Sequence, residues 1–345
     1  MNTMLAAVLH KPGDMRLEQV PVPEIGESEV LIAVKRVGIC GTDPHIFRGT
    51  FPVPYPLVQG HEFSGEVVAA GSAVTTVQVG ERVTADINMS CGKCFYCRMG
   101  QKLFCENIKQ IGVHTDGAFA QYVKAPELNI YKLPDGMTWE EAAYIEPLAC
   151  AIRGQDRANI TMGSTVAIIG AGPMGLVHAL LAKMNGAARV IISEMNATRI
   201  AKAKSLGIDH VLNAAELDPV QAVRDLTEGR GADFVIEAVG SIPTYQQAFQ
   251  MVRRGGTLVT YGAAPAAATM EIKPFEIYSK ELTIVGSYAG TYDTWVKAIA
   301  LIGSKRFKPG DIITKTIPLP QVVEGLQEAI TSKDTIKIVV DSTQI

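Results

Sequence analysis

A run of glycines between an apolar segment and a helix-like segment constrains the fold of this chain most. Val166–Ile169 is a compact apolar run, the turn Gly170–Gly175 follows it, and Met174–Met184 has a helical composition. In a strand–turn–helix unit of the form G-x-G-x-x-G, the first glycine permits a tight turn and the second lets backbone N–H groups approach a pyrophosphate. The third lets the helix pack against the strand. We therefore expect the turn to contact a dinucleotide through Gly170, Gly172, Pro173, Met174 and Gly175.

The residues after this turn alternate between strand-like and helix-like segments. The further strand-like runs are Arg189–Ser193, His210–Leu212, Phe234–Ala238, Thr257–Tyr261 and Leu282–Gly286. Helix-like stretches such as Ala197–Leu206 and Pro219–Thr227 separate the first of these runs. Such alternation is typical of a parallel, doubly wound α/β sheet. We therefore expect a Rossmann domain over residues 151–287.

The nature of the dinucleotide depends on two residues after the second predicted strand. Glu194 ends the run VIISE, about 20 residues after the glycines, where an acidic residue binds the ribose diol of NAD. A carboxylate there repels the additional phosphate of NADP. Arg199 lies nearby in the sequence and is the type of residue that accepts that phosphate. With Glu194 present, the sequence favours NAD.

Both ends of the chain differ from this central part. The first residues are rich in short Val and Ile runs broken by Gly and Pro, such as Val30–Val34, Gly65–Ala69 and Arg82–Thr84. These runs predict a β-rich domain over residues 1–150. After Leu282–Gly286 the alternation gives way to a helix-like stretch around Thr294–Ile302 and a β-like run, Ile336–Val340. We expect residues 288–345 to return to the first domain.

Composition excludes several classes of partner. The 345 residues carry 32 Lys+Arg and 35 Asp+Glu, a formal charge of -3, which argues against nucleic acid or an anionic membrane as the main partner. No stretch approaches the ~18 uninterrupted apolar residues that span a bilayer. The start, MNTMLAAVLHKPGD, lacks a basic region followed by a long apolar run, so we expect no signal peptide and a cytoplasmic location.

Four of the six cysteines lie in one short loop, residues 91–105. Cys91, Cys94, Cys97 and Cys105 form a C-x2-C-x2-C-x7-C pattern, the ligand set of a closed tetrahedral zinc site. Disulfides are the alternative, but they are rare in the reducing cytoplasm. A closed site has no open ligand position, so we expect a structural zinc ion that stabilises a loop without a core of its own.

Other metal-binding residue types are scattered. Cys40 stands in Cys40-Gly41-Thr42-Asp43-Pro44-His45, and His61-Glu62 stands in GHEFSG. Taken alone, Cys40 is more often a small buried apolar residue and His61 a hydrogen-bonded core residue. Spacing alone does not unite them.

The motifs together resemble those of a known family. CGTDPH, GHEFSGEVVAAG, the four-cysteine loop and GAGPMG occur in the order and spacing of zinc-containing medium-chain dehydrogenases, over essentially the whole chain. The resemblance implies a GroES-like catalytic domain and a Rossmann domain, with a catalytic zinc ion besides the structural one. Glu146-Pro147-Leu148-Ala149 is similar to sorbitol and other polyol dehydrogenases, whereas ethanol-type relatives place a cysteine at Glu146. The catalytic ligands it implies are Cys40, His61 and Glu62, with Glu146 as fourth ligand or as partner of the zinc-bound water.

The resemblance also implies a reaction. A hydride would pass between NAD and a small secondary alcohol, polyol or sugar-derived, while Thr42, the cofactor ribose and His45 relay the hydroxyl proton. Family members assemble as homotetramers or homodimers, and we expect the same here. The nicotinamide half of the cofactor is expected to contact Tyr261, Gly262, Ala263, Ser287 and Tyr288.

Two departures from sorbitol dehydrogenases bear on the substrate. Ala289-Gly290 stands where those enzymes carry an Arg-Tyr pair, and Ile46 follows the relay histidine where a tyrosine is common. Both changes remove polar groups that would bind a sugar alcohol. An enzyme similar to L-threonine dehydrogenases is the alternative. A non-catalytic NAD-binding zinc protein would be expected to lose Cys40, Thr42, His61 or Glu146, and all four are present.

Overall fold

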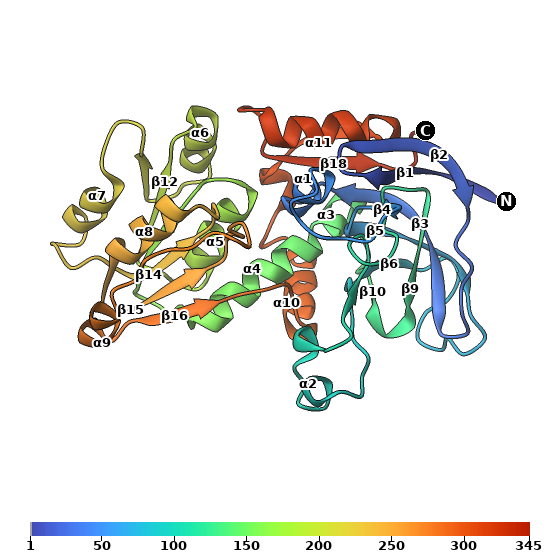
Figure 1. Cartoon of the computed structure of the whole chain (residues 1–345), viewed down its shortest axis with the longest axis horizontal. Coiled ribbons are helices and arrows are strands. Elements are labelled where there is room, and N and C mark those ends of the chain that lie inside the picture. Colours follow the sequence, from blue (N-terminus) through green and yellow to red (C-terminus); the bar gives the residue numbers. More distant parts are fainter. Residues whose placement is uncertain (1) are drawn as a thin grey trace. The chain divides into compact units, whose positions relative to one another are not determined.

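The computed structural model describes residues 2–345, which divide into two compact units (Figure 1). One unit contains the chain up to Ala149 together with Gly290–Ile345, and the other contains Cys150–Ala289. The chain therefore leaves the first unit once and returns to it. The sequence predicts domain boundaries at residues 150 and 287. These boundaries describe domains that fold independently, and that property stays a prediction.

The Cys150–Ala289 unit is built on a six-stranded sheet in which every neighbouring pair is parallel. The strand order is β13-β12-β11-β14-β15-β16. Counted from β11 it is the order of the doubly wound dinucleotide-binding fold, so the predicted Rossmann fold is confirmed. The strands are β11 (Thr165–Ile169), β12 (Arg189–Glu194), β13 (His210–Asn213), β14 (Ala232–Glu237), β15 (Val252–Thr260) and β16 (Thr283–Gly286).

Helices connect these strands and cover the sheet. Three of these helices are capped at their N-terminus by a side chain that accepts a hydrogen bond from a backbone N–H group. The capping residues are Asn196, Asp218 and Ser241. The sequence analysis did not identify α8, because few of its residues are buried and its apolar periodicity is weak. The helices are α5 (Pro173–Met184), α6 (Ala197–Ser205), α7 (Pro219–Asp225), α8 (Ile242–Met251) and α9 (Pro274–Lys280).

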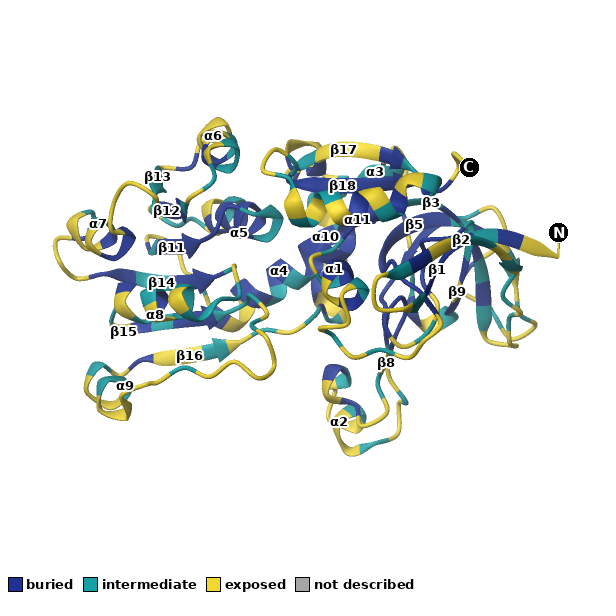
Figure 2. Cartoon of the chain, turned by 45° about the horizontal axis from the view of Figure 1, so that its top comes forward, coloured by how far each residue is buried: buried dark blue, intermediate teal, exposed yellow. Residues whose placement is uncertain are grey.

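The other unit is β-rich, as predicted. A seven-stranded sheet runs β10-β6-β5-β3-β18-β17 with β9 also on β3, beside a three-stranded sheet β2-β1-β4 and a short pair β7-β8. Val30, Ile32 and Val34 alternate along β3 and are buried. Figure 2 shows buried residues in the strands of this unit. The strands are β1 (Thr3–Lys11), β2 (Asp14–Pro21), β3 (Glu29–Gly38), β4 (Leu57–Val58), β5 (Glu62–Ala70), β6 (Arg82–Ala85), β7 (Asn88–Met89), β8 (Lys109–Gln110), β9 (Tyr122–Pro126), β10 (Ile130–Lys132), β17 (Ile313–Pro318) and β18 (Lys337–Asp341).

Short helices and turns close this sheet. None of the helices in residues 2–345 combines the length and the apolarity needed to cross a bilayer. The α-helices of this unit are α1 (Thr42–Phe47), α2 (Phe95–Arg98), α3 (Trp139–Ala143), α10 (Tyr292–Gly303) and α11 (Val322–Thr331), and α4 (Ile145–Ala158) crosses the boundary at Ala149 into the other unit. The single 3-10 turns are η1 (Lys102–Phe104), η2 (Glu127–Asn129), η3 (Pro309–Asp311) and η4 (Leu319–Gln321).

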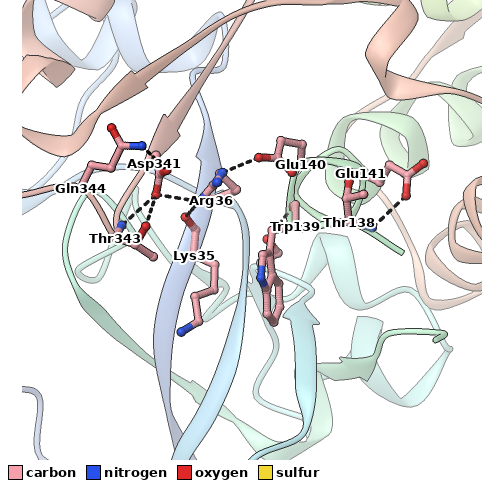
Figure 3. Close-up of polar contacts among 10 residues, drawn as sticks. Lys35, Arg36, Thr138, Trp139, Glu140, Glu141, Asp341, Thr343 and Gln344 are labelled. Atoms are coloured by element: carbon pink, nitrogen blue, oxygen red, sulfur yellow. Dashed lines mark hydrogen bonds and ion pairs between the residues drawn. The ribbon is translucent and has the colours of Figure 1, made fainter. Parts of the chain in front are cut away.

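The C-terminal strand β18 is fixed beside β3 by a cluster around Arg36 (Figure 3). The Arg36 guanidinium donates through Nε to Glu140 Oε1 at 2.6 Å and through Nη1 to Asp341 Oδ1 at 2.6 Å. It thereby joins β3, α3 and β18, and charge-assisted bonds of this kind stabilise a fold by about 1.5–3 kcal/mol each. Because β3 leads into Cys40 and β18 begins at Lys337, the cluster fixes two of the strands beside the site described next.

Candidate metal and cofactor sites

The four-cysteine loop brings its sulfur atoms together. The Sγ atoms of Cys91, Cys94, Cys97 and Cys105 all lie within 4.8 Å of one another. Cys94 precedes α2 and Cys97 lies within it, with their sulfur atoms 3.5 Å apart. Four converging thiols with no carboxylate or imidazole among them fit a closed zinc site.

Backbone N–H groups point at these sulfur atoms. The N–H groups of Cys91 and Asn107 donate to Cys105 Sγ at 3.3 and 3.4 Å. Hydrogen bonds from the backbone of Lys93 and then Cys94 lower the pKa of Cys91 to about 6. Since the thiolate is the form that binds a metal ion, this backbone favours metal binding at Cys91, whereas burial and then the neighbouring Cys94 raise the pKa of Cys97 to about 11.

A buried polar cluster connects this loop to the short strands β7 and β8 on either side of it. The fully buried Asp86 pairs with the ammonium group of Lys102, which lies between Cys97 and Cys105. Asp86 Oδ1 accepts from Asn88 N at 2.9 Å, and Gln110 Nε2 donates to Asn88 Oδ1 at 2.7 Å. The loop is therefore attached to the strands that precede and follow it.

A second cluster joins Cys40, His61 and Glu62, whose ligand atoms also lie within 4.8 Å of one another. Cys40 follows β3 and Glu62 begins β5. The pairing of Gly38 with Glu62 in these two strands brings the residues together. His61 and Glu62 are buried, whereas Cys40 is half-buried and reachable. This cluster combines a sulfur, a nitrogen and an oxygen donor. Catalytic zinc sites use mixed sets of this kind.

Asp43 supports this cluster from within. Its Oδ2 accepts from Cys40 N at 2.8 Å, which fixes the loop after β3, and its Oδ1 lies 3.5 Å from His61 Nδ1. Asp43 Oδ1 and His61 Nδ1 are both buried without a hydrogen-bond partner. A metal ion on the other ring nitrogen would be matched by a carboxylate at Nδ1, the usual arrangement of a metal-binding histidine. These unpartnered atoms therefore fit the presence of a metal ion.

The charge around His61 also suits a cation. Burial alone would lower the pKa of His61, but the negative groups of Asp43 and then Cys40 outweigh burial and raise this pKa well above its usual value. The protein environment thus attracts positive charge to this point. A bound metal ion would supply that charge in place of the proton.

Glu146 lies near this cluster without belonging to it. It is buried at the start of α4 and contributes to the electrostatic environment of Lys337, but its carboxylate is not among the three groups within 4.8 Å. Its role as fourth ligand, direct or through water, stays a prediction.

The sequence analysis overlooked Lys337. This buried residue of β18 forms an ion pair with Glu62 Oε2 and donates to Ile39 O at 2.9 Å. Burial alone would lower its pKa, but the charges of Glu62 and Cys40 raise it. The signal available in the sequence was a lysine inside the otherwise apolar run Ile336–Val340.

The two residues predicted to relay a proton lie on α1, directly after Cys40. Thr42 Oγ1 is 3.7 Å from Cys40 Sγ, so this hydroxyl borders the candidate metal site. His45 is exposed, and its Nδ1 lies 3.1 Å from Thr50 Oγ1. The exposed imidazole has access to solvent. The relay of a proton by these two residues stays a prediction.

The glycine-rich turn has the geometry its sequence requires. Gly170 has φ +95°, a conformation that L side chains rarely adopt, and a side chain at Gly175 would collide with Gly170 O. Pro173 occupies the first turn of α5, where it needs no N–H partner. The turn therefore presents a helix N-terminus of the kind that binds a pyrophosphate.

Glu194 and Arg199 both lie against this turn. Glu194 accepts from Ala171 N at 2.8 Å and from Met195 N at 2.7 Å, which fixes its carboxylate next to the second residue of the turn. Arg199 Nη1 is 4.0 Å from Glu194 Oε2, and Arg199 Nε is buried without a hydrogen-bond partner. Glu194, which would repel a ribose phosphate, and Arg199, which would attract it, therefore lie side by side at the turn.

The residues predicted to contact the nicotinamide half follow β15 and β16. Tyr261, Gly262 and Ala263 come after β15, while Ser287 and Tyr288 come after β16, and Tyr288 is exposed. Glu237, at the end of β14, is fully buried and accepts from Gly240 N at 2.9 Å. A side chain at Gly262 would collide with Glu237 and Gly240. Sequence reasoning missed Glu237, whose carboxylate fixes the loop after β14 and whose backbone carbonyl accepts from Tyr261 N and Gly262 N. In the sequence it is visible only as an acid ending an apolar strand.

Two family models match the chain. The alcohol dehydrogenase GroES-like domain matches residues 26–135, and the zinc-binding dehydrogenase model matches residues 173–304. Together with the relatives below, these matches show that the chain belongs to the zinc-containing medium-chain dehydrogenase family. It is therefore an oxidoreductase of that family, as the sequence motifs predicted.

Similar proteins differ in substrate. An L-threonine 3-dehydrogenase of Chelativorans sp. (strain BNC1) is 38% identical over 99% of both chains. The sorbitol dehydrogenase of Bacillus subtilis (strain 168) is 34% identical over 96% of this chain and 95% of its own. Among solved structures, a zinc-binding dehydrogenase from Sinorhizobium meliloti 1021 bound to NADP has 35% identity and a TM-score of 0.95, covering 99% of this chain and 100% of that one.

The Cys40 cluster predicts the outcome of a metal analysis. We expect Cys40→Ser to reduce the zinc content from about two ions per chain to about one, because a neutral hydroxyl replaces the thiolate ligand while the four-cysteine loop keeps its ion. Elemental analysis of the purified protein measures this content.

Cys150→Ser is the matched control, since Cys150 is also half-buried but belongs to neither cluster. It should leave the zinc content unchanged. An unchanged content in Cys40→Ser, with circular dichroism like that of the unsubstituted protein, would contradict the assignment of Cys40.

Proposed function

We propose that this protein is a zinc-dependent dehydrogenase that interconverts a small secondary alcohol and its ketone, with NAD as the hydride acceptor. The observation that carries the proposal is the mixed donor cluster of Cys40, His61 and Glu62, with its half-buried thiol. A structural zinc site fills all four ligand positions with protein groups, whereas three protein donors leave a position for substrate. The same chain supplies a glycine-rich turn of the dinucleotide-binding type.

The reaction requires that a proton leave the hydroxyl oxygen and a hydride leave its carbon. A zinc ion would lower the pKa of the substrate hydroxyl as a Lewis acid, and a nicotinamide ring would accept the hydride. Cys40, His61 and Glu62 would hold the metal ion, with Asp43 orienting the imidazole of His61. Water is kept from the inner side of the site because His61, Glu62 and Asp43 are buried.

Thr42 and His45 would transfer the proton from the substrate hydroxyl to solvent. The Thr42 hydroxyl, 3.7 Å from Cys40 Sγ, is placed to accept the proton that the substrate loses while passing its own outward. His45, exposed on the same helix, would deliver the proton to solvent, since a histidine exchanges protons near neutral pH.

The substrate class rests on what the relatives share. L-Threonine at its third carbon and sorbitol at its inner carbons are both secondary alcohols, and both are acted on by similar proteins according to their names. A polyol or sugar-derived alcohol is the first candidate, because Glu146 stands in the segment typical of polyol dehydrogenases. L-Threonine is the second candidate, favoured by the L-threonine 3-dehydrogenases among the relatives. A catalytically silent NAD-binding protein would not need Thr42 and His45 beside an intact donor cluster.

A substrate panel tests this proposal. We expect oxidation of at least one polyol, sugar acid or L-threonine with NAD, and loss of about 1,000-fold or more of that activity in Cys40→Ser, because Lewis-acid stabilisation supplies several kcal/mol of the barrier reduction. Absorbance of the reduced cofactor follows each reaction, with Cys150→Ser as the control. Activity that survives Cys40→Ser would contradict the proposed metal site, and inactivity on the whole panel would favour the silent protein.

The choice of NAD rests on Glu194. Its carboxylate is fixed by backbone N–H bonds from Ala171 and Met195, next to the turn that would hold the pyrophosphate, so a 2′-phosphate there would face a negative charge. Arg199 is close enough to favour that phosphate, and the similar S. meliloti structure is bound to NADP. We propose that the carboxylate of Glu194, which backbone N–H groups hold in place, outweighs Arg199 and decides the preference for NAD.

Glu194→Gln tests this preference. Removing the carboxylate charge while keeping its shape should raise the ratio of kcat/KM for NADP over NAD by about 10-fold or more, since about 1.4 kcal/mol of lost repulsion is a factor of ten. Steady-state kinetics with both cofactors measure the ratio. Glu228→Gln, an exposed acid of the same unit, is the control and should not change it.

We further propose that copies of this chain pair through the edge strand β16. Thr283 and Gly286 in this strand are exposed, and so is Ile284, at 41% of its surface. Figure 2 shows β16 as an exposed and half-buried strand at the edge of its sheet. The adjacent helix α9 exposes Phe275 and Tyr278. An uncovered apolar edge of this kind is a site for strand pairing with a second copy, which gives a symmetric dimer.

Ile284→Lys should therefore shift the protein toward the monomer, because a buried lysine at the strand edge opposes pairing. Light scattering after size-exclusion chromatography measures the mass. Val296→Lys is the matched control, since Val296 is similarly exposed on α10. A monomeric unsubstituted protein, or an unchanged oligomer in Ile284→Lys, would contradict this interface.

A further inference from the structure

A tyrosine of α8 holds the backbone of the loop that follows β15. The hydroxyl of Tyr245 donates to the carbonyl oxygen of Gly262. Burial and then the charge of Glu237 raise the pKa of Tyr245 to about 12, so this hydroxyl keeps its proton near neutral pH and stays a donor. Tyr245 therefore joins α8 to the segment Tyr261–Ala263, which is expected to contact the nicotinamide half of the cofactor.

The end of β14 adds a second attachment to the same loop. The carboxylate of Glu237 accepts from Val239 N and Gly240 N, each at 2.9 Å, and its backbone carbonyl accepts from Gly262 N at 2.8 Å. A Cβ atom at Gly262 would lie 2.3 Å from Gly240 N, and one at Gly240 would lie 2.6 Å from Ala263 O. The loops after β14 and β15 thus pack backbone against backbone, and neither can shift without the other.

The segment is also packed from the other face of the sheet. The connections from β11 to β12 and from β14 to β15 run in opposite directions across the sheet, so right-handed crossovers place α5 and α8 on opposite faces. The ring of His178, in α5, meets the ring of Tyr261 nearly at a right angle, with the ring centroids 4.3 Å apart. Gly154 leaves the space for this contact, since a Cβ atom there would lie 3.0 Å from His178 Cε1. The neighbours Tyr261 and Gly262 are therefore held from the two faces.

A binding segment that is ordered in advance costs less conformational entropy when its ligand arrives. We propose that Tyr245 is a positioning residue for the cofactor, which holds the segment Tyr261–Ala263, through the Gly262 carbonyl, in the conformation that receives the nicotinamide ring. The turn Gly170–Gly175 and Glu194, which would bind the other half of the cofactor, do not depend on this bond. The inference rests on the proposed function, because it requires that a nicotinamide ring lie against the segment.

Two ligands that differ only in the nicotinamide ring provide the test. NADH carries the ring, whereas ADP-ribose has the adenosine, the pyrophosphate and the second ribose without it. In Tyr245→Phe we expect the Kd of NADH to rise about 5-fold or more, which is about 1 kcal/mol and the usual contribution of one hydrogen bond, while the Kd of ADP-ribose changes by less than about 2-fold. Titration calorimetry on the full-length protein measures both constants.

Hydrogen exchange followed by mass spectrometry reports on the segment without any ligand. The amides of Tyr261 and Gly262 should exchange slowly in the unsubstituted protein, because both donate to Glu237 O. Tyr245→Phe should accelerate their exchange about 5-fold or more and leave the amides of β11 unchanged. Tyr278→Phe is the matched control, since it removes the hydroxyl of an exposed tyrosine in the same unit, and it should change neither the exchange nor the two Kd values.

Each contrary result overturns a defined claim. If Tyr245→Phe weakens ADP-ribose as much as NADH, Tyr245 stabilises the whole unit and the proposal is wrong, and an unchanged Kd of NADH has the same consequence. If Tyr245→Phe does not fold, the unsubstituted protein still decides, because fast exchange at Tyr261 and Gly262 without cofactor would contradict a segment ordered in advance. An unsubstituted protein that does not bind NADH would overturn the proposed function, and this inference with it.

Discussion

The antiparallel pairing of β3 with β5 and β18 is the interaction on which the rest of the molecule depends. It places the residue after the end of β3, Cys40, beside the start of β5, with His61 and Glu62, and beside β18, with Lys337. None of these residues is near the others in sequence except His61 and Glu62. The site therefore exists only because the backbone ladder holds three strands side by side, and Arg36 locks two of these strands at 2.6 Å contacts.

Local patterns in the sequence predicted most of the central unit. Each predicted strand from Val166–Ile169 to Leu282–Gly286 corresponds to a strand of the sheet, because buried parallel strands are continuous apolar runs. The glycine turn was equally visible, since its backbone conformation excludes other residues. The helix α8 was missed because it buries little apolar surface, and a pattern method depends on burial.

The candidate site was predictable only in part. The four cysteines of the zinc loop are close in sequence, so spacing alone indicated their chemistry. Cys40 and His61 were united by resemblance to a family and not by spacing. Lys337 was overlooked because its partner is 275 residues away, and no local rule connects a lysine in an apolar run with a distant acid. Nor did sequence place Glu146 relative to the ligand cluster, because helix start and strand end meet only through tertiary packing.

The same separation of 275 residues between Glu62 and Lys337 has a consequence for how the chain is made. A ribosome produces Glu62 before Lys337, and the entire Cys150–Ala289 unit emerges between them. Domains fold as they leave the ribosome, so that inserted unit can complete its sheet while the first unit still lacks β18. Until β18 is in place, the carboxylate of Glu62 lacks the ammonium group of Lys337, so this edge of the first unit is completed only after the inserted unit has emerged.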